Sequence, residues 1–85
     1  MYTKSQQVEQ AYDDAHYENC SSEGCYSLAV AAAHELGGVE LWNSNVGNRT
    51  YSFAPTRVFE FDDGTAVTVT YGACFEGAME PIPSA

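Results

Sequence analysis

Basic side chains are scarce in this sequence. Lys4, Arg49 and Arg57 are its only Lys and Arg residues, against 12 Asp and Glu residues, and the net charge at neutral pH is −9. Proteins bind the phosphates of nucleic acids and the anionic surfaces of membranes through clusters of Lys and Arg. A chain this acidic repels both kinds of surface, so the composition excludes direct nucleic-acid binding by any ordinary electrostatic route.

Long apolar runs are also missing. The longest, Leu28 to Ala33, is much shorter than the roughly 20 residues that a membrane-spanning helix needs. No apolar stretch follows Lys4, so residues 1–7 lack the pattern of a secretory signal. The 3 cysteines are an odd number, which argues against a disulfide framework and favours a reducing compartment. We therefore expect a cytoplasmic protein that does not contact membranes.

The apolar material that is present suffices for a folded domain. Hydrophobic residues make up 45% of the 85 residues, and one Trp, six Tyr and four Phe are among them. A chain of this size buries roughly 60–65% of its unfolded surface, which leaves little room for a deep active site. We expect a single domain, residues 1–85, with frayed ends at residues 1–4 and 80–85.

Two helices are predicted in the first half of the chain. Residues 5–18 carry less polar side chains at the spacing of one helical face: Val8, Ala11, Tyr12 and Ala15. Thr3 or Ser5 can cap this helix, and residues 21–24 interrupt the pattern. A second helix, residues 25–36, is rich in Ala and is stopped by Gly37 and Gly38. Because it is nearly apolar all round, we expect it to be buried on most sides.

The second half of the chain alternates polar and apolar residues with the period of a β-strand. The predicted strands comprise residues 39–42, 51–53, 57–61 and 65–71, and Asp62, Asp63 and Gly64 form a hairpin turn. From Gly72 onward we expect a tail in which Phe75 and Met79 are packed. The sequence thus predicts an α+β fold: two N-terminal helices packed on a three- to four-stranded antiparallel sheet.

One metal-binding pattern is present only in part. His34 and Glu35 match the start of the zinc-protease helix, but Gly38 stands where the second histidine ligand is needed. His34 is better explained as a histidine in the last turn of a helix, near the negative end of the helix dipole. We predict no metal site and no cofactor.

The cysteines leave alternatives open. Cys25 stands at a predicted helix start, which lowers the pKa of a thiol, and His16 can approach it only if the helices fold back antiparallel. A small thiol hydrolase using Cys25 and His16 is therefore an alternative to a non-enzymatic function. His16, Cys20 and Cys25 can also gather three metal ligands, but a fourth is missing. A Cys20–Cys25 disulfide is sterically conceivable, and Cys74 has no evident partner.

Acidic side chains without interspersed Lys and Arg are the strongest functional signal. Four of them follow the outer face of the first helix, and the hairpin turn extends the set if it lies on the same side. Tyr17 is added as an aromatic anchor. The predicted partner-binding residues are Glu9, Asp13, Asp14, Tyr17, Glu18, Asp62 and Asp63. The predicted partner is a basic protein surface that binds nucleic acid.

In size, charge and lack of an enzymatic motif, the chain resembles small acidic proteins that phages and mobile elements encode against host defence, in particular the anti-CRISPR proteins. The resemblance is one of type and covers no alignable motif. It implies a stoichiometric inhibitor, acting as a nucleic-acid mimic in the basic channel of a CRISPR effector in the host cytoplasm. A phage structural or assembly subunit that self-associates through residues 39–53 is a further alternative.

Overall fold

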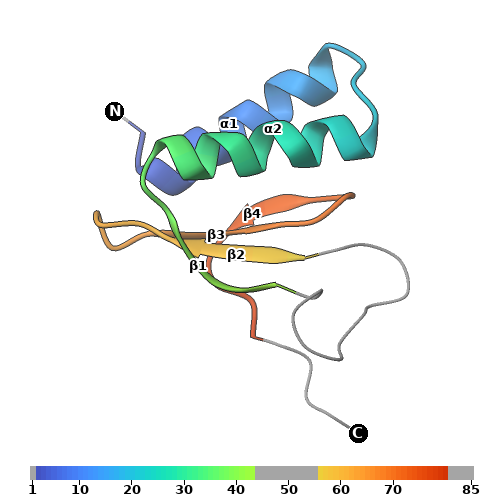
Figure 1. Cartoon of the computed structure of the whole chain (residues 1–85). Helices are drawn as coiled ribbons and strands as arrows, with labels where there is room; N and C mark the ends of the chain where they lie inside the picture. Colours follow the sequence, from blue (N-terminus) through green and yellow to red (C-terminus); the bar gives the residue numbers. More distant parts are fainter. Residues whose placement is uncertain (1, 44–55, 81–85) are drawn as a thin grey trace, which may run out of the picture.

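A computed structural model of the chain describes residues 2–43 and 56–80 (Figure 1). Two helices precede four strands: α1 Lys4–Tyr17, α2 Ser22–Glu35, β1 Val39–Asn43, β2 Arg57–Glu60, β3 Ala66–Val69 and β4 Cys74–Glu76. The strands form one antiparallel sheet in the order β1-β2-β3-β4. The predicted α+β fold is confirmed. The strand expected at residues 51–53 lies outside the described residues.

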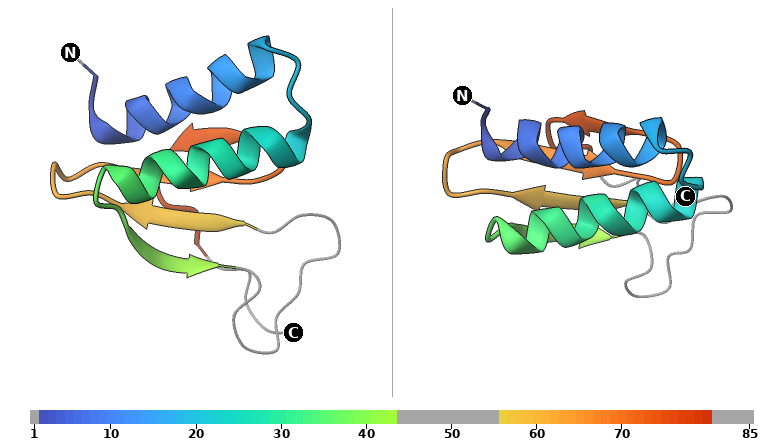
Figure 2. Two further views of the ribbon diagram at one scale, coloured as in Figure 1. Left: turned by 45° about the horizontal axis from the view of Figure 1, so that its top comes forward. Right: turned by 90° about the horizontal axis from the view of Figure 1, so that it is seen from above.

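The two helices lie side by side on one face of the sheet, and α1 covers β3 and β4 (Figure 2). The core between the layers consists of Val8, Tyr12, Ala15, Cys25, Ala29, Ala33, Phe59, Phe61, Val67 and Val69. The second helix is less buried than its composition predicts, since Leu28 keeps 50% of its surface exposed. A two-layer arrangement leaves one side of α2 without a covering element among the described residues.

The start of α1 is fixed to the β2–β3 hairpin. Thr3 caps the helix by accepting a hydrogen bond from the Gln6 amide, and the Gln6 side chain accepts one in return from the Thr3 amide at 3.0 Å. The Lys4 amide donates to Asp63 at 2.8 Å, and the Lys4 ammonium pairs with Asp62. Thr3 and Lys4 are thus bound to the rest of the domain, where we expected a frayed end.

Left-handed residues close both helices. Asn19 has φ 65° and Gly37 has φ 78°, and each is followed by an amide that bonds back to a carbonyl five residues earlier. After α2 this bond joins the Gly38 amide to the Ala33 carbonyl at 2.9 Å. The pattern is the Schellman motif, which ends a helix and turns the chain sharply. The motif after α1 turns the chain so that α2 runs back along α1. The motif after α2 leads the chain into β1.

The second helix begins three residues earlier than the sequence indicated. Ser21 accepts a hydrogen bond from the Gly24 amide at 3.1 Å and is the N-cap residue. Residues 22–24, which we predicted to be a break, therefore form the first helical turn. A serine cap supplies the acceptor that the first amides of a helix lack, and it compensates for the poor helix propensity of glycine.

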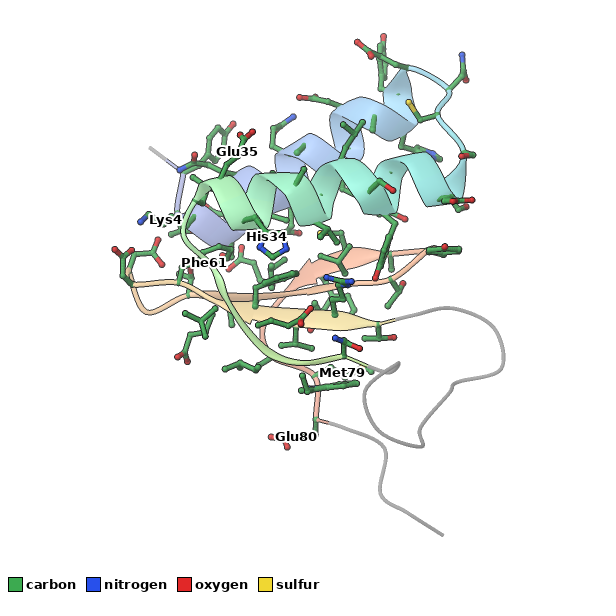
Figure 3. All side chains as sticks on the ribbon, in the orientation of Figure 1. Lys4, His34, Glu35, Phe61, Met79 and Glu80 are labelled. Atoms are coloured by element: carbon green, nitrogen blue, oxygen red, sulfur yellow. The ribbon has the colours of Figure 1, made fainter. Side chains whose placement is uncertain are left out.

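The sheet face opposite the helices is crossed by the chain after β4. Thr68 on β3 donates its hydroxyl to the Gly77 carbonyl at 2.8 Å and accepts from the Met79 amide at 3.0 Å. The Trp42 indole donates to the Met79 carbonyl at 2.8 Å, and Figure 3 places Met79 on this side of the sheet. Thr68 and Val58 are completely buried as a result. Packing of Met79 was predicted, whereas strand β4 was not.

We predict that Gly38→Ala destabilises the fold. An added Cβ at Gly38 would lie 2.8 Å from Cε1 of Phe61 and 2.9 Å from the carbonyl oxygen of Ala33. Overpacking of this kind costs roughly 1–3 kcal/mol. Gly72→Ala is the matched control, because its Cβ would meet nothing within 4 Å. Urea unfolding measures both variants, and equal midpoints for the two would contradict this account of the α2–β1 connection.

Candidate functional site

The described basic side chains are neutralised within the protein. Lys4 pairs with Asp62, and the Arg57 guanidinium lies 3.2 Å from the carboxylate of Glu40. No other ion pair with Lys or Arg occurs among residues 2–43 and 56–80, a part of the chain that holds all 12 acidic residues. The remaining carboxylates therefore present their charge to solvent.

The acidic residues of α1 do not share one face of the helix. At about 100° per residue, Asp14 lies about 140° around the helix from Glu9, and Glu18 lies about 180° from it. Glu9 and Asp13 are one turn apart and face β4, whereas Asp14 and Glu18 point elsewhere into solvent. Tyr17 is 88% exposed near the end of the helix. The continuous acidic face expected from the sequence is thus divided.

Glu9, Asp13 and Glu76 form a cluster where α1 meets β4, which we call the acidic edge. Glu76 lies close enough to Glu9 for its carboxylate to act on the ionisation of Glu9. Burial raises the pKa of Glu9 above its usual value of 4.5, and the negative charges of Glu76 and Asp13 raise it further. Repulsion between these carboxylates is a cost that the folded protein carries.

The hairpin carboxylates have a structural role that the sequence did not reveal. Asp63 accepts hydrogen bonds from the Lys4 amide at 2.8 Å and from the Thr65 amide at 3.0 Å. The Lys4 amide is the first cause of a pKa of Asp63 below its usual range, and the Thr65 donors add to it. Asp62 and Asp63 lie at the opposite end of α1 from Glu18, and Lys4 partly neutralises them.

A pocket of about 570 Å³ lies where the α1–α2 turn meets the β3–β4 hairpin. Both turns are at the same end of the molecule in each view of Figure 2. The walls comprise Tyr12, Asp13, His16, Tyr71 and all three cysteines, Cys20, Cys25 and Cys74. The antiparallel helices bring His16 and Cys25 to one pocket, as the thiol hydrolase alternative requires.

The cysteines of this pocket are free thiols in a mostly buried setting. Cys25 is only 1% exposed, and its Sγ lies 3.9 Å from the carbonyl oxygen of Cys20. Cys74, for which the sequence offered no partner, joins them because the β3–β4 hairpin returns it toward α1. In the part of the chain that the structure describes, no three His, Cys, Asp or Glu residues are arranged to hold a metal ion.

Burial and nearby carboxylates keep one thiol of the pocket, Cys74, in its neutral form. Burial raises the pKa of Cys74 to about 12, and the charges of Glu9 and Asp13 contribute to this increase. The Cys74 thiol is therefore protonated at neutral pH and unreactive as a nucleophile. Tyr12 donates its hydroxyl to the Tyr71 carbonyl at 2.9 Å and so fixes α1 to the β3–β4 turn.

Comparison with known protein families, with curated proteins and with solved structures found no match to this chain. Of the helices within residues 2–43 and 56–80, neither has the length and apolar character needed to cross a bilayer. The function is therefore inferred from the acidic surface and from the pocket.

We predict that Glu9→Gln stabilises the protein at neutral pH. The raised pKa of Glu9 means that its ionised form weakens the folded state, and the amide removes this charge. Below the ordinary pKa of 4.5 the glutamic acid is protonated in both the folded and the unfolded chain, so the gain disappears there. Thermal unfolding of both proteins at pH 7 and at pH 3.5 measures the difference. A gain that persists unchanged at the lower pH would show that ionisation of Glu9 does not weaken the folded state.

Proposed function

We propose that this protein is a stoichiometric, non-enzymatic inhibitor that binds a basic, nucleic-acid-binding surface of a host protein and excludes nucleic acid from it. The observation that carries the proposal is that Lys4 and Arg57 are paired within the fold, while most carboxylates face solvent without a Lys or Arg partner among the described residues. Grooves that hold phosphates are lined with Lys and Arg, and they attract such a surface.

The positions of the acidic residues along α1 favour a role in binding a partner over a role in stabilising the helix. The first turn of α1 carries no acidic residue, and its acidic side chains follow toward the C-terminal end, where Glu18 is the C-cap residue. The helix dipole favours negative charge at the N-terminus and disfavours it at the C-terminus. Carboxylates chosen for stability alone would have the opposite order, so their placement is better explained by an external partner.

The spacing of the carboxylates is compatible with partial mimicry of a nucleic-acid strand. Glu9 and Asp13 are about 6 Å apart along the helix axis, against a phosphate every 3.4 Å or so on one DNA strand. Glu76 on β4 adds a third charge beside Glu9. As the resemblance to anti-CRISPR proteins implies, we propose that the partner is a CRISPR effector and that the inhibitor acts in the host cytoplasm.

The thiol hydrolase alternative has less support. His16 and Cys25 line one pocket, but the Cys25 side chain is 1% exposed and offers a substrate almost no access. Nucleophilic catalysis needs a thiolate that reaches the reacting carbon. The assembly alternative uses residues 39–53, of which only β1 lies within the described residues, with Val39 65% exposed. The inaccessible thiol leads us to favour the binding function over the hydrolase.

Charge reversal on α1 tests the proposal. Asp13→Lys combined with Asp14→Lys should weaken partner binding by at least about tenfold, or about 1.4 kcal/mol. It should also flatten the dependence of binding on salt. Glu23→Lys combined with Glu35→Lys is the matched control, because it changes the net charge equally on exposed positions of α2. The partner is captured from a bacterial lysate and eluted with a short DNA duplex, and its affinity is then measured by titration.

Two results would contradict the proposal. In the first, labelled DNA stays bound to the partner when equimolar inhibitor is added. In the second, the α1 variant binds the partner as tightly as the original protein does, or loses no more affinity than the α2 control. Either result would show that the acidic surface of α1 does not occupy a nucleic-acid site.

A further inference from the structure

The pocket at the α1–α2 turn has both apolar and polar walls. Tyr12 and Tyr71 contribute aromatic side chains, and the three cysteines contribute weakly polar sulfur. Two serines, the imidazole of His16 and the carboxylate of exposed Asp13 complete the polar part of the wall. Its volume of about 570 Å³ is within the range of small-ligand sites, roughly 300–1,000 Å³. None of its lining residues is Lys or Arg. A cavity whose wall combines aromatic and sulfur groups with a carboxylate fits a cation that also has an apolar or planar part.

The charges around the pocket favour a positive occupant. Glu9 and Asp13 both act on the Cys74 thiol in the pocket wall and disfavour its ionisation. The same two charges lower the free energy of a cation placed beside that thiol. The described Lys and Arg side chains, Lys4 and Arg57, are paired with Asp62 and Glu40 and do not line the pocket, so His16 is the one described basic side chain in its wall.

Contacts within the fold hold the pocket walls in place before any ligand enters. The hydroxyl of Tyr12 bonds to the carbonyl of Tyr71, and the Tyr71 ring packs edge-on against Tyr26, with centroids 4.9 Å apart. Asn19 closes the end of α1 with φ 65° and fixes the path of the α1–α2 turn. A preformed site loses little conformational entropy on binding, which favours affinity.

We propose that this pocket receives an arginine side chain of the basic partner, with the guanidinium bound to Asp13 and the aliphatic stem against the tyrosine and cysteine walls. The inference rests on the proposed function and names one contact of that interface. Arginine fits better than lysine because its guanidinium is planar, less strongly hydrated, able to stack on aromatic rings and able to bond a carboxylate through two N–H groups. Buried arginines are frequent anchors of protein interfaces.

Binding of small model compounds to the intact protein tests the pocket. Nα-acetyl-arginine methylamide and Nα-acetyl-lysine methylamide are titrated separately into ¹⁵N-labelled protein, and the amide shifts are followed by NMR. The arginine compound should cause saturable shifts at Asp13, Cys20 and residues 71–74, with at least fivefold higher affinity than the lysine compound. Shifts that do not saturate, or equal affinities for the two compounds, would overturn the proposal.

Two single-charge variants distinguish binding in the pocket from nonspecific attraction of a cation to the acidic surface. Asp13→Asn removes the carboxylate of the pocket wall and should weaken arginine binding at least fivefold. Asp14→Asn removes the same charge from the neighbouring position, which does not line the pocket, and should leave binding within about twofold. Equal losses in both variants would overturn the pocket as an arginine site. Failure of the proposed function is seen independently, when DNA and inhibitor do not compete for the partner.

Discussion

Every acidic side chain of this protein stays in contact with water, and the rest of the structure is arranged around that constraint. Among residues 2–43 and 56–80 the buried polar residues are Ser5, Thr56 and Thr68, none of which is ionised. Burying an unpaired carboxylate is costly, and the described chain has only Lys4 and Arg57 as Lys or Arg partners. The core is accordingly a single apolar layer between two helices and a sheet. The negative charge remains at the surface, where the carboxylates repel one another and attract cations.

The few polar contacts inside the fold hold the charged surface in place. The capping box at Thr3 and the bonds from Lys4 to the β2–β3 hairpin fix one end of α1. The bond from Tyr12 to the Tyr71 carbonyl fixes its other half to the β3–β4 turn. The acidic edge and the pocket are therefore carried by a helix that is secured at both ends. A rigid presentation of charge is what binding to a preformed basic groove requires.

Local signals in the sequence predicted the two helices, the β2–β3 hairpin and the α+β class, because each has a clear periodicity or turn. The early start of α2 was missed because Gly24 weakens the pattern that the Ser21 cap sustains. Strand β4 has only 3 residues, too few to show alternation. The positions of Cys74 and Glu76 beside α1 follow from that strand's register, a tertiary property. The division between Glu9 and Glu18 around α1, by contrast, follows from helical periodicity alone, so the sequence already contained it.

The central claim is that the carboxylates of the folded protein are largely without internal counterions. The most direct measurement is the melting temperature at pH 7 as sodium chloride rises from about 10 to about 200 mM, where the Debye length falls from roughly 30 to below 10 Å. Screening should relieve repulsion more in the compact state than in the unfolded chain, so the account predicts a steady rise in melting temperature. A melting temperature that stays constant or falls would contradict it, because carboxylates already neutralised within the fold gain nothing from added salt.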